Sequence, residues 1–303
     1  MKIGVLFNCQ SRGIAESLGL LRPDDEIIHF AIPKLIRSKA ARVEAGAALK
    51  ACDVIVASDT HYRLGPAAPE RFRAAGLPVA TVPPIIFSGF HPDCCYPASR
   101  DEEGGGGQFD GPTGMMHSRI AIASFLGGLT PQEAAPLFNR LVFARLDYFA
   151  RFAEQKALLL ERYRNVAGIE LAPLFAEWCG TGCFMHSDNH PKAFVLHDVA
   201  RIACDLLALP TASSAGQPAP RDFLAHFPHH PVYPEIAAQL GVEPVPLFRL
   251  PNGARGEPLY VGLEEFLALS FAAYREVPRA TLSAVEGMQA TMASLGLSDG
   301  GSA

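Results

Sequence analysis

The first hundred residues alternate between short apolar segments and segments whose apolar residues recur at helical intervals. The apolar segments are brief enough for buried strands, and they cover residues 2–7, 26–32, 52–58 and 78–87. After the first of them, Ile14, Leu18 and Leu21 have helical spacing, and residues 39–50 predict a further helix. Strands and helices in alternation predict an α/β fold with a parallel sheet.

A glycine-rich stretch separates this part from the rest of the chain. Residues 98–114 contain few apolar side chains, which predicts a flexible surface loop, with a lid over an active site as the alternative. Beyond it the pattern is mainly helical. A capping box at 130–133 opens a helical region that reaches about residue 164, with a break near Pro136. Further helices are expected over residues 191–209, 262–276 and 279–295.

These patterns predict one α/β domain over residues 1–297. Its βαβ-rich part covers residues 1–97, its mainly helical part covers residues 115–297, and the tail over 298–303 is expected to be disordered. Because polar loops follow several strands of the first part, we expect the candidate site there.

Charge and hydropathy exclude several classes of protein. The net charge is -5 and no long run of Lys or Arg occurs, which argues against binding to nucleic acid or to membrane surfaces. No apolar stretch reaches the roughly 18 residues of a membrane span, and the N-terminal apolar run is too short for a signal peptide. The sequence therefore predicts a cytoplasmic protein, in which the seven cysteines are thiols and mostly small buried hydrophobes.

Polar stretches follow apolar segments at four places, residues 7–13, 58–66, 87–97 and 186–192. In an open parallel sheet, ligands bind at the carboxyl ends of the strands. The first three stretches come directly after predicted strands. We therefore expect them to converge in space although they lie far apart in the sequence.

Cys9 lies where the first predicted strand meets the first helix. The positive end of a helix favours the nucleophilic thiolate, and the amides of Asn8 and Gln10, with the backbone N–H groups of residues 11–13, are placed to bind an oxyanion. The arrangement resembles the nucleophile after the first strand of many esterases, with Cys in place of Ser, so a sheet of Rossmann or SGNH-like type is expected. The alternative is a buried cysteine beside a Gln10 that caps the helix.

Histidines on the polar stretches are candidates for a general base. They are His61, His91 and His190. Asp93 is placed to orient an imidazole, and His61 is also a candidate for substrate contact. His190 precedes a predicted helix, whose N-terminus would keep the imidazole neutral. The alternative is that Asp188 or Asn189 only caps that helix.

The sequence also contains a metal-like pattern and several basic residues near the polar stretches. A C-x3-C-x2-H-x3-H pattern spans residues 179–190, but its spacing is narrower than that of common zinc sites and no second Cys pair accompanies it, so we expect no metal. Basic residues near the polar stretches are candidates for phosphate binding, with a solvated surface charge as the alternative for each. They are Arg12, Arg37, Lys39 and Arg63.

In this order, the polar stretches resemble the WcbI-type polysaccharide biosynthesis family, which is regarded as a family of coenzyme A-binding acyltransferases in capsule synthesis. The resemblance rests on Asn-Cys-Gln at 8–10, on the pattern F-x-G-x-H-P-D-x-x-Y within 83–97, and on Asn-His-Pro at 189–191. It extends to about residue 280. The chain departs from the family at Phe7, where Gly is common, and in the glycine-rich insert at 104–107.

This resemblance implies transfer of an acetyl or other acyl group from a coenzyme A thioester to a sugar hydroxyl, with Cys9, His91 and His190 in the site. A small-molecule acyl donor and a saccharide acceptor would then be its partners, and a homo-oligomer is left open. Either a histidine deprotonates the hydroxyl for direct attack, or the acyl group passes first to Cys9. The alternatives are a cysteine-dependent ester or thioester hydrolase and a non-catalytic coenzyme A-binding protein.

Overall fold

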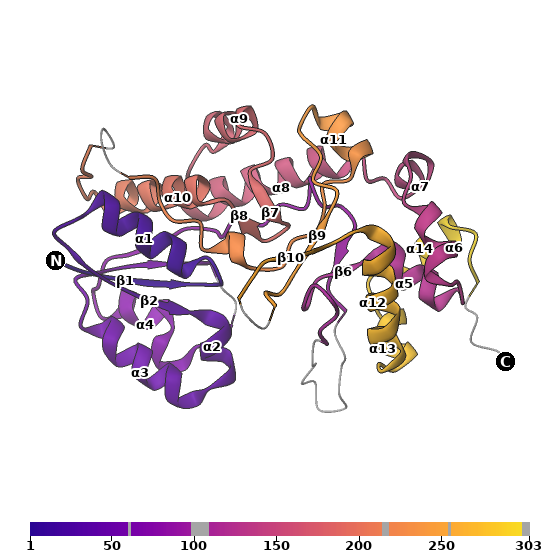
Figure 1. Ribbon diagram of the computed structural model, residues 1–303. Coiled ribbons are helices and arrows are strands. Elements are labelled where there is room, and N and C mark those ends of the chain that lie inside the picture. The colour runs from indigo at the N-terminus through magenta and orange to yellow at the C-terminus, as the bar shows by residue number, and fades with distance from the viewer. Residues whose placement is uncertain (60–61, 98–108, 214–217, 254–255, 299–303) are drawn as a thin grey trace. The chain divides into compact units, whose positions relative to one another are not determined.

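The computed structural model describes residues 1–59, 62–97, 109–213, 218–253 and 256–298 (Figure 1). The chain forms two compact units, each built from several separate segments. The sheet unit comprises Met1–Ile86, Ala157–Met185 and Asn189–Ala225. The second unit comprises Phe87–Lys156, His186–Asp188 and His226–Ala303. The expected single domain over residues 1–297 stays a prediction. Most of the expected glycine-rich loop, with its insert at 104–107, and the tail from residue 299 lie outside the described residues.

A four-stranded parallel sheet is the centre of the sheet unit, in the order β2-β1-β3-β4. Its strands are β1 (Lys2–Phe7), β2 (Glu26–Ala31), β3 (Val54–Ala57) and β4 (Val79–Thr81). Residues 3–7 of β1 and all of β3 are buried, as expected for strands covered on both faces. The α/β fold class predicted from the sequence is confirmed.

Helices cover both faces of this sheet (Figure 1). The helical elements that lie wholly within the sheet unit are α1 (Ser11–Leu21), α2 (Ile32–Arg37), α3 (Lys39–Lys50), η1 (Gly65–Ala67), α4 (Pro69–Ala74), α9 (Ala172–Gly180) and α10 (Ala193–Leu206). The boundary between the two units falls within α8 (Arg151–Ala167), β7 (Met185–Ser187) and η3 (Leu224–His226). Helix α1 packs closely on α10, because a Cβ on Gly13 would lie 2.4 Å from Leu196 Cδ1. On the opposite face, Leu49 of α3 and Phe72 of α4 belong to the same buried cluster as Ile55 of β3.

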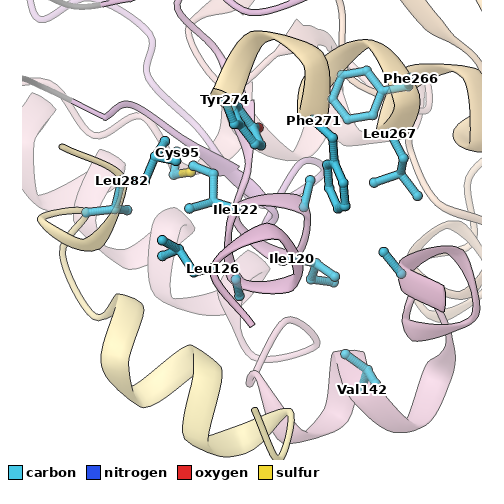
Figure 2. Close-up of a cluster of buried hydrophobic side chains, with 14 of the residues drawn as sticks. Cys95, Ile120, Ile122, Leu126, Val142, Phe266, Leu267, Phe271, Tyr274 and Leu282 are labelled. Atoms are coloured by element: carbon cyan, nitrogen blue, oxygen red, sulfur yellow. The ribbon is translucent and has the colours of Figure 1, made fainter. Parts of the chain in front are cut away.

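The second unit is mainly helical. Its elements are β5 (Cys94–Cys95), β6 (His117–Ser118), α5 (Arg119–Leu126), α6 (Pro131–Ala134), η2 (Ala135–Leu137), α7 (Arg140–Arg145), α11 (Pro234–Leu240), β9 (Phe248–Leu250), β10 (Leu259–Val261), α12 (Leu263–Arg275), α13 (Arg279–Ser283) and α14 (Met288–Ser294). Its core surrounds α5, where Ile120, Ile122 and Leu126 lie among side chains of α12 such as Phe271 and Tyr274 (Figure 2). A mainly helical C-terminal half was predicted and is confirmed.

Element bounds differ from the sequence predictions where proline and glycine intervene. The strand expected over 78–87 ends at Thr81, since Pro83 and Pro84 cannot donate to a sheet ladder. The region from 131 to 164 is split into α6, η2, α7 and α8, and the last helix is split before Gly287, which has a φ of 72°. The capping box at Thr130 is present, with both of its hydrogen bonds to Glu133. Among the described residues, no helix has the length and apolarity needed to cross a membrane.

Candidate functional site

The Asn8–Cys9–Gln10 turn lies at the carboxyl end of β1, directly before α1. The Asn8 side chain shapes this turn, because its Oδ1 accepts a 3.0 Å hydrogen bond from the Gln10 backbone N–H. The backbone carbonyl of Asn8 accepts from Ser11 N–H at 3.1 Å. The Ser11 N–H, one of the backbone N–H groups expected to bind an oxyanion, therefore donates to the carbonyl of Asn8 within the turn. Cys9 is half-buried, at the strand-to-helix junction where the sequence placed it.

Gln10 connects three segments that are distant in the sequence. Its side chain is completely buried, and its Nε2 donates to the backbone carbonyls of Ile85 at 2.8 Å and Asn189 at 3.1 Å. Its Oε1 accepts from Ile85 N–H at 3.2 Å. The sequence suggested that this amide contacts substrate. The structure instead uses it to hold the turn beside the segments that contain Ile85 and Asn189.

His190 is placed next to this connection but not at a helix terminus. It lies in β8 (His190–Pro191) with 7% exposure, directly after the residue whose carbonyl Gln10 binds. Helix α10 begins only at Ala193, whose N–H donates to Asp222 Oδ2 at 3.3 Å. The expectation that His190 lies at the helix N-terminus is therefore wrong, and neither Asp188 nor Asn189 is the N-cap, which is Lys192.

A cavity of about 500 Å³ lies at the carboxyl edge of the sheet, within the sheet unit. Asn8 after β1 and Ser58 after β3 both line it. Strand β2 lies on one side of β1 and β3 on the other, so these two strand ends mark the topological switch point, where open α/β sheets bind ligands. The turn that contains Cys9 thus borders the position at which this fold class forms its sites.

An ion pair lies in the wall of this cavity and was not expected from the sequence. Arg162 of α8 donates from Nε and Nη2 to the two carboxylate oxygens of Asp59, both at 2.8 Å. Asp59 belongs to a polar stretch that the sequence singled out, whereas Arg162 belongs to a distant helix. Only its position opposite Asp59 in the fold identifies Arg162 as part of this wall.

The basic residues expected to bind phosphate lie on the surface of the sheet unit. Arg12 is exposed and stacks over the Phe223 ring at 3.9 Å. Arg37, Lys39 and Arg63 are also exposed, and none of the four belongs to the cavity wall. Two of them immediately follow wall residues in the chain, namely Ile36 and Tyr62. Their role in binding an anionic ligand stays a prediction.

His91 and Asp93 belong to the second unit, and their convergence with Cys9 stays a prediction. The Nδ1 atom of His91 lies 3.1 Å from the Pro231 carbonyl oxygen. Asp93 is buried, and it accepts hydrogen bonds from the hydroxyls of Tyr148 and Tyr233 and from Ile120 N–H. Burial raises the pKa of the Asp93 carboxyl. These contacts make Asp93 an anchor for α5, which differs from the expected contact with an imidazole or substrate.

Two further expectations concern His61 and the zinc-like pattern at 179–190. His61 lies outside the described residues. Within the described part of the chain, no group of three or more His, Cys, Asp or Glu side chains is arranged to hold a metal ion. This includes the cysteines and histidines of the zinc-like pattern at 179–190.

Comparisons with known proteins agree with this architecture. The model of the family described as polysaccharide biosynthesis enzyme WcbI matches residues 2–212. A solved structure of WcbI superposes with a TM-score of 0.71 at 14% sequence identity, over 97% of this chain and 98% of that chain. That structure is described as the native protein without a disulfide bond between coenzyme A and one of its cysteines. No curated protein matches the chain.

Proposed function

We propose that this chain, which belongs to the family of WcbI polysaccharide biosynthesis enzymes, transfers an acyl group from a coenzyme A thioester to a sugar hydroxyl. The family assigns it to polysaccharide biosynthesis. The thioester donor, the sugar acceptor and the reaction type are our proposal. Coenzyme A thioesters are intracellular metabolites, so the proposed reaction takes place in the cytoplasm.

The observation that carries the proposal is the position of Cys9. The Gln10 side chain fixes this half-buried thiol between Asn8, which lines the cavity, and the segment of His190. A thiol at a helix N-terminus has its thiolate stabilised by the backbone N–H groups and the helix dipole. A thiolate, an adjacent amide and a nearby imidazole are the groups that acyl transfer requires.

In the covalent route, Cys9 Sγ attacks the thioester carbonyl and forms a new thioester, while the bond to the coenzyme sulfur breaks and that sulfur leaves as the thiol. The Asn8 side chain donates from Nδ2 to the developing oxyanion, since its Oδ1 already accepts from the Gln10 N–H. A sugar hydroxyl then attacks the acylated Cys9, and His190 accepts the hydroxyl proton. In the direct route the same histidine, or His91, deprotonates the hydroxyl for attack on the donor.

The proposed donor would be bound by the residues that line the cavity and by exposed basic residues near it. The cavity receives the thioester end, and the exposed cations Arg12, Arg37, Lys39 and Arg63 are candidates for its phosphates. The description of the solved WcbI structure in terms of coenzyme A and a cysteine supports this choice of donor. Such a donor supplies the activated acyl carbonyl, and the protein supplies the groups that position and attack it.

The test is an acylation experiment with purified protein and acetyl coenzyme A, read by intact mass and peptide mapping. We expect an acyl adduct on Cys9 that is absent from Cys9→Ala and retained in Cys179→Ala, which removes another half-buried thiol. Coenzyme binding without an adduct would select the direct route. Absence of coenzyme binding would overturn the proposal, and release of free coenzyme A without any sugar acceptor would favour a hydrolase instead.

A further inference from the structure

We infer that the cavity at the carboxyl edge of the sheet holds an aliphatic acyl chain longer than acetyl. The inference rests on the proposed function, which it deepens by naming the class of donor. It concerns the wall of the cavity, its charge and its volume, all of which belong to the sheet unit.

The wall of the cavity is largely aliphatic. The aliphatic residues that line it are Ile32, Pro33, Ile36, Pro84 and Ile86, and Tyr62 lines it as well. Ile36 and Ile86 are 41% and 42% exposed, so the wall presents apolar surface of large aliphatic residues to water. A hydrocarbon chain placed there would remove this surface from water.

The charged groups of the wall do not favour an anion. Asp59 and Arg162 form a bidentate pair, so the positive charge of Arg162 is already compensated. A phosphate or carboxylate that bound at Nε and Nη2 of Arg162 would have to displace Asp59 and leave the charge of Asp59 without a partner. The cavity therefore suits the uncharged end of the donor rather than its phosphates.

A saccharide is also a poor match for this wall. Each sugar hydroxyl that loses water needs a hydrogen-bond partner, and an unpaired buried hydroxyl costs about 1–3 kcal/mol. The aliphatic residues offer no such partner. The uncharged polar residues of the wall are Asn8 and Ser58, which follow the carboxyl ends of β1 and β3, and Tyr62. Asn8 and Ser58 suit one carbonyl group better than a ring of hydroxyls.

Volume distinguishes a long acyl chain from acetyl. The cavity measures about 500 Å³, whereas a two-carbon acetyl group has the bulk of two or three water molecules at about 30 Å³ each. Acetyl alone would leave water against the aliphatic wall. Each added methylene replaces such water with apolar contact, which strengthens binding by about threefold to fourfold until the cavity is filled.

The inference is tested with S-ethyl, S-butyl and S-hexyl coenzyme A, thioethers that cannot transfer their chain, by titration calorimetry. We expect S-hexyl coenzyme A to bind at least tenfold more tightly than the S-ethyl analogue. Ile36→Trp and Ile86→Trp fill the cavity from two sides, and each should reduce this preference to below threefold. Val43→Trp is the matched control, since Val43 is 52% exposed on α3 outside the cavity wall, and it should keep the preference.

The possible outcomes separate this inference from the proposed function. Equal affinity for all three analogues, or weaker binding of the longer ones, would overturn the acyl-chain site and leave coenzyme A binding intact. A chain-length preference that survives both cavity-filling variants would place the chain elsewhere and overturn it as well. Failure of every analogue to bind would overturn the proposed function itself.

Discussion

At the scale of single residues, Gln10 shows how one buried amide can organise a candidate site. Its three hydrogen bonds satisfy the N–H and carbonyl of Ile85 and the carbonyl of Asn189. Ile85 follows two prolines, in a segment that no sheet ladder extends into. The Gln10 amide therefore replaces the hydrogen bonds that a neighbouring strand would have made, and it fixes the turn that contains Cys9.

Replacing Gln10 should affect both stability and chemistry. Gln10→Ala leaves buried backbone groups unpaired, and we expect a loss of about 2–4 kcal/mol in the free energy of unfolding. Gln10→Glu should cost at least as much at neutral pH, because a carboxylate cannot donate to the carbonyls of Ile85 and Asn189. Urea unfolding measures both effects. The exposed Gln132→Ala is the control and should stay within about 0.5 kcal/mol of wild type.

A second measurement separates the effect of Gln10 on the position of Cys9 from its effect on stability. Under conditions where the Gln10 variants are folded, acylation of Cys9 by acetyl coenzyme A should be slower than in wild type by at least tenfold, since the turn is no longer fixed. An unchanged acylation rate in a folded variant would show that Gln10 only stabilises the fold.

At the scale of secondary-structure elements, close approaches at glycine determine how helices cover the sheet. Gly46 of α3 packs against η1, and a Cβ there would lie 2.7 Å from the Pro66 carbonyl oxygen. Backbone atoms cannot move aside as a side-chain terminus can. Gly19 of α1 is the opposite case, since a Cβ at this position would meet no atom within 4 Å.

Substitution of these two glycines by alanine should change the free energy of unfolding in opposite directions. Alanine is favoured over glycine in a helix interior by about 1 kcal/mol, so Gly19→Ala should raise the free energy of unfolding by about 0.5–1 kcal/mol. In Gly46→Ala this gain is outweighed by overpacking, which typically costs about 1–3 kcal/mol, and the variant should be less stable than wild type. Thermal or urea unfolding of the pair measures the difference. Stabilisation by Gly46→Ala would contradict the packing seen between α3 and η1.

At the scale of the whole molecule, the second unit carries buried histidines in its core. His117 contacts the Tyr274 hydroxyl and the Phe109 carbonyl, and burial lowers its pKa to about 4. His230 contacts Thr113 Oγ1, and burial, together with the nearby His91 and His117, lowers its pKa to about 3. Both imidazoles are therefore neutral in the folded protein at neutral pH.

This burial makes folding sensitive to acid. In the unfolded chain the two histidines bind protons near pH 6.5, whereas in the folded protein they bind them only near pH 4 and pH 3. The unfolded state therefore binds more protons in this window, and stability falls as the pH drops from about 6.5 to 4, by roughly 3 kcal/mol for His117 alone. The raised pKa of Asp93 acts in the opposite direction below neutral pH.

The contribution of the two histidines is isolated by comparing how steeply the free energy of unfolding falls with pH in wild type and in variants. Urea unfolding of wild type and His230→Gln between pH 7 and pH 4 should show a shallower loss of stability in the variant, whatever its stability at pH 7. The same comparison applies to His117→Asn. Parallel slopes in wild type and both variants would show that these imidazoles do not titrate differently in the folded and unfolded states.

Much of the sheet unit was predictable because its signals are local. Buried parallel strands are short apolar runs and amphipathic helices have a fixed period, so β1, α1, β2 and α3 could be located from residues 2–50 alone. The Thr130 capping box was predictable for the same reason, since its hydrogen bonds join residues three positions apart. Where proline or glycine stopped an element early, as after Thr81, the pattern continued beyond the hydrogen-bonded structure.

The candidate site was predictable only in part. The position of Cys9 followed from the order of a strand and a helix, but the roles of its neighbours depend on contacts between distant segments. Gln10 binds carbonyls of residues that lie far ahead of it in the chain, and Arg162 meets Asp59 from a different helix. Asp93 is enclosed by tyrosines whose positions no local pattern indicates.

The sequence by itself determined the fold class, the family and the strand-to-helix position of Cys9, because these depend on short-range periodicity and on motifs that can be read along the chain. Only the tertiary structure decided that Gln10 joins the turn of Cys9 to the segments of Ile85 and Asn189, that His190 precedes its helix by several residues, and that a largely aliphatic cavity is lined by Asn8. Hydrogen-bond partners and cavity walls arise from packing between residues that are remote in sequence, and periodicity carries no information about which of them will meet.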